Sequence, residues 1–218
     1  YSGVRIETSS NVIKNNTIFK NVGRGLDVLV ISSPTATNNK VSQNSIYNNG
    51  NSGDPTAKLR IGFDLGWDGT SVNDNKDPDT GPNDYTNFPV ITGAVPGGSS
   101  CSELISGSYN GLANTQYYIE VFASDVCNGD TSGTNNYATV GYNYGEGKTY
   151  IGASSVFTTD VNGNGVWSLS VPFSTIVGQY ITATSIQNNG AVINNTREFM
   201  QCFYVTYDCG DAPDTYHT

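Results

Sequence analysis

Charged residues, histidine and strong helix formers are scarce in this chain of 218 residues. Asp, Glu, Lys and Arg together make up 13% of it, and the formal net charge is −9. A nucleic-acid-binding protein needs a basic face, so this balance excludes nucleic acid as a partner. No apolar run approaches the length of a membrane span, and we expect no membrane insertion. His217 is the only histidine, which excludes histidine-based catalytic triads and histidine-rich metal sites.

Asn, Gly, Ser and Thr are abundant, whereas Lys, Glu and Leu are few. With so few strong helix formers, the chain is predicted to be all-β. A low charge combined with many Asn, Thr, Ser and Tyr residues is typical of extracellular β proteins, so we expect an extracellular or cell-surface location. The sequence opens at Tyr1 in the middle of a strand pattern, and we expect the chain to be a piece of something larger.

A repeat near the start of the chain is its most informative feature. When Asn16 is set on Asn44, Ile18 falls on Ile46 at an offset of 44 − 16 = 28 residues. A short strand that recurs with asparagine at the same edge is typical of a solenoid. Residues 1–65 are therefore predicted to be coils of a parallel β-helix, with inward Ile, Val and Leu side chains and ladders of stacked asparagines at the turns.

Two sets of short strands are predicted to stack on successive coils. One set begins at Gly3, Gly25 and Gly62, and the other comprises the apolar positions of 12–13, 17–18, 41 and 45–46. Two or three coils leave an open parallel edge, and such edges attract further strands. The expected partners are therefore copies of this chain or other coils of a parent chain.

Residues 66–87 form an Asp/Asn/Gly/Pro-rich connector with little apolar content. Closely spaced oxygen ligands suit calcium, a hard cation that takes six to eight oxygens, although the spacing matches no EF-hand loop. The alternative is a solvated acidic linker. The candidate calcium ligands are Asp68, Asn73, Asp74, Asn75, Asp77, Asp79 and Asp84.

Residues 88–206 are predicted to form an antiparallel β-sandwich of the immunoglobulin or fibronectin type. Alternation within residues 115–124 places Tyr118, Glu120 and Phe122 on one face, with the intervening apolar residues on the other. The predicted strands cover residues 88–95, 103–109, 115–124, 148–159, 165–172, 178–187 and 196–205.

The four cysteines, Cys101, Cys127, Cys202 and Cys209, are an even number without metal-ligand spacing. Disulfides in an oxidising compartment explain them best, and three pairings are open.

The Gly- and Asn-rich stretch 128–146 is predicted to leave one end of the sandwich as a long loop. Its aromatic residues Tyr137, Tyr142 and Tyr144 are candidates for a glycan-binding platform. The alternative is that tyrosines cover strand faces and loop edges, as they commonly do.

Several blocks of the sequence resemble bacterial secreted right-handed parallel β-helix repeat proteins. Residues 64–92, DLGWDGTSVNDNKDPDTGPNDYTNFPVIT, resemble the segment that joins the last coil of those proteins to a β-sandwich. YYIEVFAS, YGEGKTYIG, FTTDVNGNG, GQYITATSIQ and REFMQC resemble parts of that sandwich. Residues 207–218, YDCGDAPDTYHT, resemble the opening of an acidic module in the same large proteins, although Cys209 interrupts the match.

The resemblance implies a multi-domain secreted or surface-attached protein without catalytic residues. It implies a disulfide between Cys127 and Cys202, which would leave Cys101 to pair with Cys209. It also implies that residues 207–218 begin a further module or a tail.

We therefore expect a structural, non-catalytic segment of an extracellular fibre, stalk or adhesin. Self-assembly through the open edge of the coils would make it a filament subunit. One alternative is a glycan- or protein-binding module of a large surface protein. A less favoured one is a fragment of a polysaccharide-degrading β-helix enzyme that uses paired carboxylates. It is less favoured because the charged residues of the coils are scattered and because catalytic groups usually lie mid-rod, whereas these coils are expected to be the last ones.

Overall fold

The computed structural model describes residues 2–31, 35–50, 61–97, 102–127, 144, 146–172, 175–188, 190 and 194–206. The regular elements of these residues are β-strands and one short 3-10 helix, η1 (Pro82–Tyr85), so the described part of the chain is all-β as predicted. Among these residues, no helix is long and apolar enough to cross a membrane.

The N-terminal third passes repeatedly through three small parallel sheets. Strands β1 (Val4–Ile6), β4 (Leu26–Val28) and β7 (Phe63–Leu65) form one sheet in that order. The second sheet pairs β2 (Val12–Lys14) with β5 (Lys40–Ser42), and the third pairs β3 (Thr17–Phe19) with β6 (Ser45–Tyr47). We call β1–β3 the first coil and β4–β6 the second coil; β7 begins a third pass.

The predicted stacking of these strands is confirmed for one set and corrected for the other. Val4 pairs with Leu26, which pairs with Phe63, as the Gly-led repeats predict. The other set, predicted as one strand, is two strands in two sheets. The chain turns between them at Asn15 and Gln43, which have the left-handed φ values of 59° and 54°. A strand cannot continue through that conformation.

The interior of the coils is a column of aliphatic residues. Branched side chains stack on their counterparts one coil away, because strands in register place equivalent residues directly above one another. Ile18 lies on Ile46 in the third sheet, and Ile6 precedes Val28 and Leu65 in the first. All five side chains are buried in one hydrophobic cluster.

The remainder of the chain forms two antiparallel sheets. One has the order β13-β9-β8, from β8 (Val90–Gly97), β9 (Ser102–Asn110) and β13 (Asn164–Pro172). The other has the order β11-β10-β14-β15, with β12 also paired to β10. Its strands are β10 (Gln116–Ser124), β11 (Thr149–Ala153), β12 (Phe157–Thr158), β14 (Tyr180–Gln187) and β15 (Phe203–Tyr204).

Two of the predicted strands differ from the structure. The segment 148–159 is divided into β11 and β12, because both meet β10 at different places along its length. In the segment 196–205 only β15 is a regular strand. Before it, the chain pairs with β14 irregularly, through the N–H groups of Arg197 and Met200, which donate to the carbonyls of Ser185 and Ala183 at 3.0 Å. The other five predicted strands match β8, β9, β10, β13 and β14 with small shifts at their ends.

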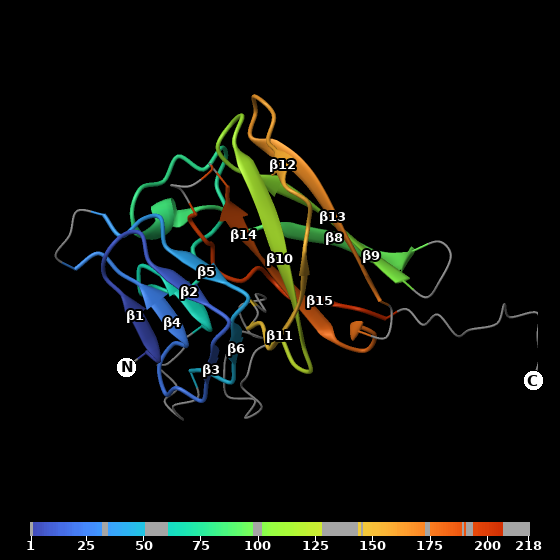
Figure 1. The fold of residues 1–218 in the computed structure, drawn as a ribbon, viewed down its shortest axis with the longest axis horizontal. Helices are drawn as coiled ribbons and strands as arrows, with labels where there is room; N and C mark the ends of the chain where they lie inside the picture. The colour runs from blue at the N-terminus through green and yellow to red at the C-terminus, as the bar shows by residue number, and fades with distance from the viewer. Residues whose placement is uncertain are drawn as a thin grey trace, which may run out of the picture.

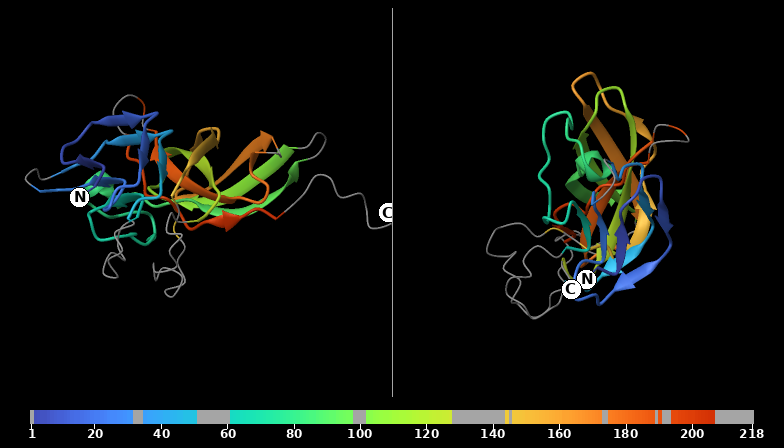
Figure 2. Two further views of the ribbon diagram at one scale, coloured as in Figure 1. Left: turned by 90° about the horizontal axis from the view of Figure 1, so that it is seen from below. Right: turned by 90° about the vertical axis from the view of Figure 1, so that its left-hand side faces the viewer.

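Strand β10 belongs to two hydrophobic cores at once. Ile119 and Val121 pack in the core between the two antiparallel sheets, together with Ile105 and Trp167. Phe122, on the opposite face of β10, packs in the core of the coils. Figures 1 and 2 show the consequence, with the parallel strands at one end of the molecule and the antiparallel sheets at the other, joined along this strand.

Candidate functional site

The corners of the two coils repeat the same backbone conformation, a left-handed residue followed by an asparagine. In the first coil, the left-handed residues Ser10, Asn15 and Lys20 each precede an asparagine. In the second coil, the corresponding left-handed residues lie 28 positions later, at residues 38, 43 and 48. Each corner therefore turns the chain sharply and places an asparagine side chain directly over the one in the next coil.

These asparagines form three ladders of hydrogen bonds. The backbone N–H of Asn16 donates to Oδ1 of Asn44 at 2.9 Å, and that of Asn21 donates to Oδ1 of Asn49 at 3.2 Å. Asn11 donates to Asn39 in the same way at 2.9 Å. In return, Nδ2 of Asn49 donates to the carbonyl of Ile18 at 3.0 Å. Each ladder supplies an acceptor from the later coil to a backbone donor of the earlier one.

The second coil has no complete coil after it, and other parts of the chain supply the acceptors. The N–H of Asn39 donates to Oδ1 of Asn83 in the connector at 3.0 Å. The N–H of Asn49 donates to Oε1 of Glu146 at 2.9 Å. At the middle corner, Glu120 of β10 accepts from the N–H of Gln43, the residue before Asn44, at 2.8 Å. Buried side chains thus occupy the positions that the next coil's asparagines would take.

Other polar groups extend this closure along the edge of the second coil. Thr196 Oγ1 accepts from the N–H of Val41 at 2.9 Å, and Asn195 Oδ1 accepts from the N–H of Asn38 at 2.6 Å. The carbonyl of Gly147 accepts from the N–H of Ile46 at 2.8 Å. An unpaired buried N–H is costly, so these contacts stabilise an edge that would otherwise lack partners. We call the whole set of acceptors the coil cap.

Glu198 closes the start of the third pass and is fully buried. Its Oε1 accepts from the N–H of Leu65 at 2.6 Å, and its Oε2 accepts from the N–H of Ser71 at 3.0 Å. Burial raises the pKa of Glu198 to about 8, although Arg197, 3.6 Å away, and the two amides lower it. Burial likewise raises the pKa of Glu120, against the lowering effect of its bond to Ser42.

A column of charged residues lies on the sheet β1-β4-β7. Asp27 and Asp64 are paired residues of adjacent strands and are both buried. Arg5 forms an ion pair with Asp27 at 3.2 Å, and Arg24 forms one with Asp64. Both guanidinium groups also lie 5.3 Å from the ring of Trp67. The sequence showed these charges as scattered, but the parallel register brings them together, and each carboxylate is occupied by a guanidinium.

Burial raises the pKa of Asp64 to about 6, because desolvation outweighs the lowering effect of Arg24. Such paired carboxylates differ from a glycosidase pair, whose two groups face a substrate between them.

The acidic connector is folded against the rest of the chain by amide side chains. Asn73 bonds the backbone of Phe88 through both its side-chain atoms, at 2.8 Å each. Asn87 bonds the backbone of Asp74 in the same two-fold manner. Asn83 is fully buried and donates to the carbonyls of Asn39 and Thr196. The sequence did not show that this apolar-poor segment would be ordered by asparagine-to-backbone bonds.

The predicted calcium ligands lie at different places in this connector. Asp68, Asn75 and Asp79 are exposed, whereas Asp77 is buried and accepts from the N–H of Asn87 at 3.1 Å. Asp84 accepts from Asn195, and Asn73 and Asp74 are held by the bonds just described. Within the described ranges, no three Asp, Glu, Cys or His side chains gather in a group that could hold a metal ion. Calcium binding stays a prediction.

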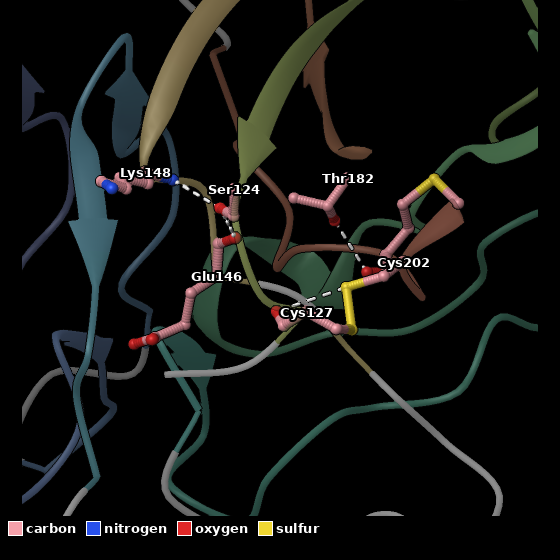
Figure 3. The surroundings of a disulfide bond; sticks show 7 residues. Ser124, Cys127, Glu146, Lys148, Thr182 and Cys202 are labelled. Carbon is pink, nitrogen blue, oxygen red and sulfur yellow. Dashed lines mark hydrogen bonds between the residues drawn. A yellow bond between two sulfur atoms is a disulfide. The ribbon is translucent and has the colours of Figure 1, made fainter. Parts of the chain in front are cut away.

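A disulfide joins Cys127, just after β10, to Cys202, just before β15. This is the pairing that the resemblance implies. Figure 3 shows it beside Ser124, whose hydroxyl donates to the carbonyl of Glu146 at 2.9 Å. The N–H of Glu146 in turn donates to the carbonyl of Cys127 at 3.2 Å. The disulfide therefore lies next to the backbone that positions one carboxylate of the coil cap.

The remaining predicted residues fall partly outside the described residues. Cys101 and Cys209, predicted to pair, lie there, as do Tyr137 and Tyr142 of the proposed glycan platform. Tyr144 is described: it is half-buried, packs edge-on against Phe88 at a centroid distance of 5.4 Å, and pairs with Gln201.

The geometry of the coil cap was not evident from the sequence. Alternation predicted that Glu120 and Phe122 lie on the face of β10 opposite Ile119 and Val121, and this is confirmed, but no local pattern showed that the coils cover that face. A scan against models of known protein families gives no match to this chain, and neither does a search of curated proteins.

Proposed function

We propose that this chain is a structural, non-catalytic segment of an extracellular bacterial fibre, stalk or adhesin. In this proposal the parallel strands are the last coils of a right-handed parallel β-helix, and the antiparallel sheets are an immunoglobulin- or fibronectin-like sandwich that closes it. The role of the sandwich is to end the rod without leaving an open edge, which would otherwise recruit strands from other molecules.

The observation that carries the proposal is the difference between the two ends of the asparagine ladders. At the second coil, Asn83 and Glu146 continue the ladders and close them. At the first coil, the Oδ1 atoms of Asn11, Asn16 and Asn21 accept no hydrogen bond from the described residues. In the second coil, the equivalent Oδ1 atoms accept from backbone N–H groups of the first coil. The first coil thus offers the acceptors that a preceding coil would use.

A parent chain would supply the preceding coil, whereas a copy of this chain, whose second coil is closed by the coil cap, would meet this edge with its own first coil. Solenoid repeats bury their faces only against neighbours, so a short array gains stability from each added coil. Val12 and Val22 of the first coil are 65% and 59% exposed, and a further coil would cover part of this apolar surface.

Light scattering on a sizing column, with electron microscopy of the same sample, tests this proposal. Because the coil cap closes the second coil, association of copies through the open first coil predicts end-to-end dimers of the unmodified chain and not filaments. The double variant Asn16→Lys, Asn21→Lys should remove them, because it places like charges on the edge where the two first coils would meet. Asn162→Lys, in an exposed turn of the sandwich, is the matched control. Cleavage of an acidic polysaccharide by the chain would contradict a non-catalytic role.

A further inference from the structure

The sheet β13-β9-β8 has two edges that differ in protection. Strand β8 carries a register shift between Ile91 and Gly93 and a proline at Pro96. Both features hinder pairing with another strand. Strand β13 pairs with β9 through nine consecutive residues without a shift, has no charged side chain, and reaches a proline only at Pro172. By these criteria β13 is an unprotected edge.

The outer side of β13 lacks backbone partners among the described residues. β9 is the strand it pairs with there, and no side chain bonds the backbone from Val166 to Val171 in that part of the chain. Alternate N–H and C=O groups therefore point away from the sheet. In a parallel or antiparallel ladder, these groups are the ones that accept a further strand.

A shallow groove of about 490 Å³ runs beside this edge. Its lining comprises the link between β11 and β12, from Ser155 to Phe157, and Val166 to Ser168 of β13. The groove also extends over the neighbouring strands, to Ser106 and Gly107 of β9 and Thr92 of β8. Val156 and Val166 are 48% and 79% exposed, and no charged residue lines the groove. It offers an extended segment both apolar contact and uncharged surroundings.

We propose that β13 pairs with β13 of a second copy of this chain, antiparallel about a two-fold axis at Ser168. Two three-stranded sheets would then form one continuous sheet, and each strand would lie along the other copy's groove. This inference rests on the sandwich alone and does not depend on the proposed stacking of coils.

Self-complementarity is the argument for a second copy as the occupant, and along this edge charge does not oppose it. Each molecule carries a net charge of −9, so two copies repel wherever their acidic surfaces meet. Along β13 there is no charge to repel. The two-fold axis sets Ser168 against itself and Val166 against Ser170, so no like-charged pair lies across the interface. The same patch serves both partners, as a closed dimer requires.

The test uses the full chain carrying Asn16→Lys and Asn21→Lys, so that end-to-end stacking does not contribute. Sedimentation velocity from about 1 µM to about 1 mM should show a reversible dimer. Adding Ser168→Lys should weaken dimerisation by roughly five- to tenfold, because two lysines then face each other. Ser168→Thr and Val90→Lys, the latter on the opposite edge, should leave the dimer unchanged. Ser168 and Val90 both have exposed side chains, so the variants should fold.

A cross-linking variant tests the register directly. Facing residues of antiparallel strands have Cα atoms close enough for a disulfide. Ser168→Cys should therefore give a covalent dimer that reductant dissolves, absent from the same chain without the new cysteine. A chain that stays monomeric at the highest concentration would overturn the proposal. So would a dimer that Ser168→Lys leaves intact and Ser168→Cys fails to cross-link.

Discussion

Replacing Glu198 by glutamine tests how the coil cap responds to pH. Glu198 is buried, and its pKa is raised to about 8 from the ordinary 4.5. Because the folded state then binds the proton more tightly than the unfolded state, this group's contribution to stability is fully present below about pH 4.5. It is lost as the pH rises toward 8. The shift corresponds to a change in the free energy of unfolding on the order of 5 kcal/mol.

The variant Glu198→Gln removes the titration and keeps a carbonyl oxygen to accept from Leu65. Asp64, with a pKa of about 6, contributes to the pH dependence with the same sign, so the dependence should shrink and not vanish. Urea unfolding at about pH 5 and about pH 8 gives the free energy of unfolding at each pH. The unmodified chain should lose several kcal/mol between them, and the variant clearly less.

Glu7→Gln serves as the control, because Glu7 lies on the first coil away from the coil cap. This variant should keep the full pH dependence. Equal losses of stability in the unmodified chain and in Glu198→Gln would refute the assignment of the pH dependence to this carboxyl group.

Three further predictions concern the disulfide, the coil cap and the acidic connector. Replacing Cys127 and Cys202 together by alanine should lower the free energy of unfolding by about 2–4 kcal/mol in urea titrations, because the bond closes a separation of 75 residues; an unchanged midpoint would contradict this. Glu120→Ala should cost about 2–4 kcal/mol, because the hydroxyl of Ser42 and the N–H of Gln43 lose their acceptor, whereas Tyr118→Phe on the same face should cost much less. If the connector binds calcium, a chelator should lower the melting temperature by several degrees, and Asp77→Ala with Asp79→Ala should abolish that sensitivity; a melting temperature indifferent to chelator would end the calcium hypothesis.

The strands of the coils were largely predictable because their sequence pattern repeats from one coil to the next. The alignment of Asn16 on Asn44 and Ile18 on Ile46 is the observed register, and the Gly-led strands stack as expected. The corners were harder to predict, since left-handed φ values fall on Asn15 and Lys20. Lysine rarely adopts this conformation, so no residue preference marks that corner.

The coil cap was not predictable, because it depends on contacts between distant segments. Alternation in β10 placed Glu120 on the face opposite the intervening apolar residues, but a polar face usually indicates solvent. Glu146 lies in a segment without a clear period, and Arg197 and Glu198 lie where a strand was expected. Their burial is a property of how the two parts of the chain pack, which a local pattern does not encode.

The order in which the chain emerges during synthesis gives the coil cap a further consequence. Thr196 lies 155 residues after Val41, and Glu198 lies 133 residues after Leu65. At typical synthesis rates, the edge of the coils waits on the order of ten seconds for the residues that close it. During that interval the nascent strands present unpaired N–H groups, and contacts of such long range form slowly. A product that terminates before Glu198 would keep its edge open, so we expect truncated chains to aggregate where the complete chain does not.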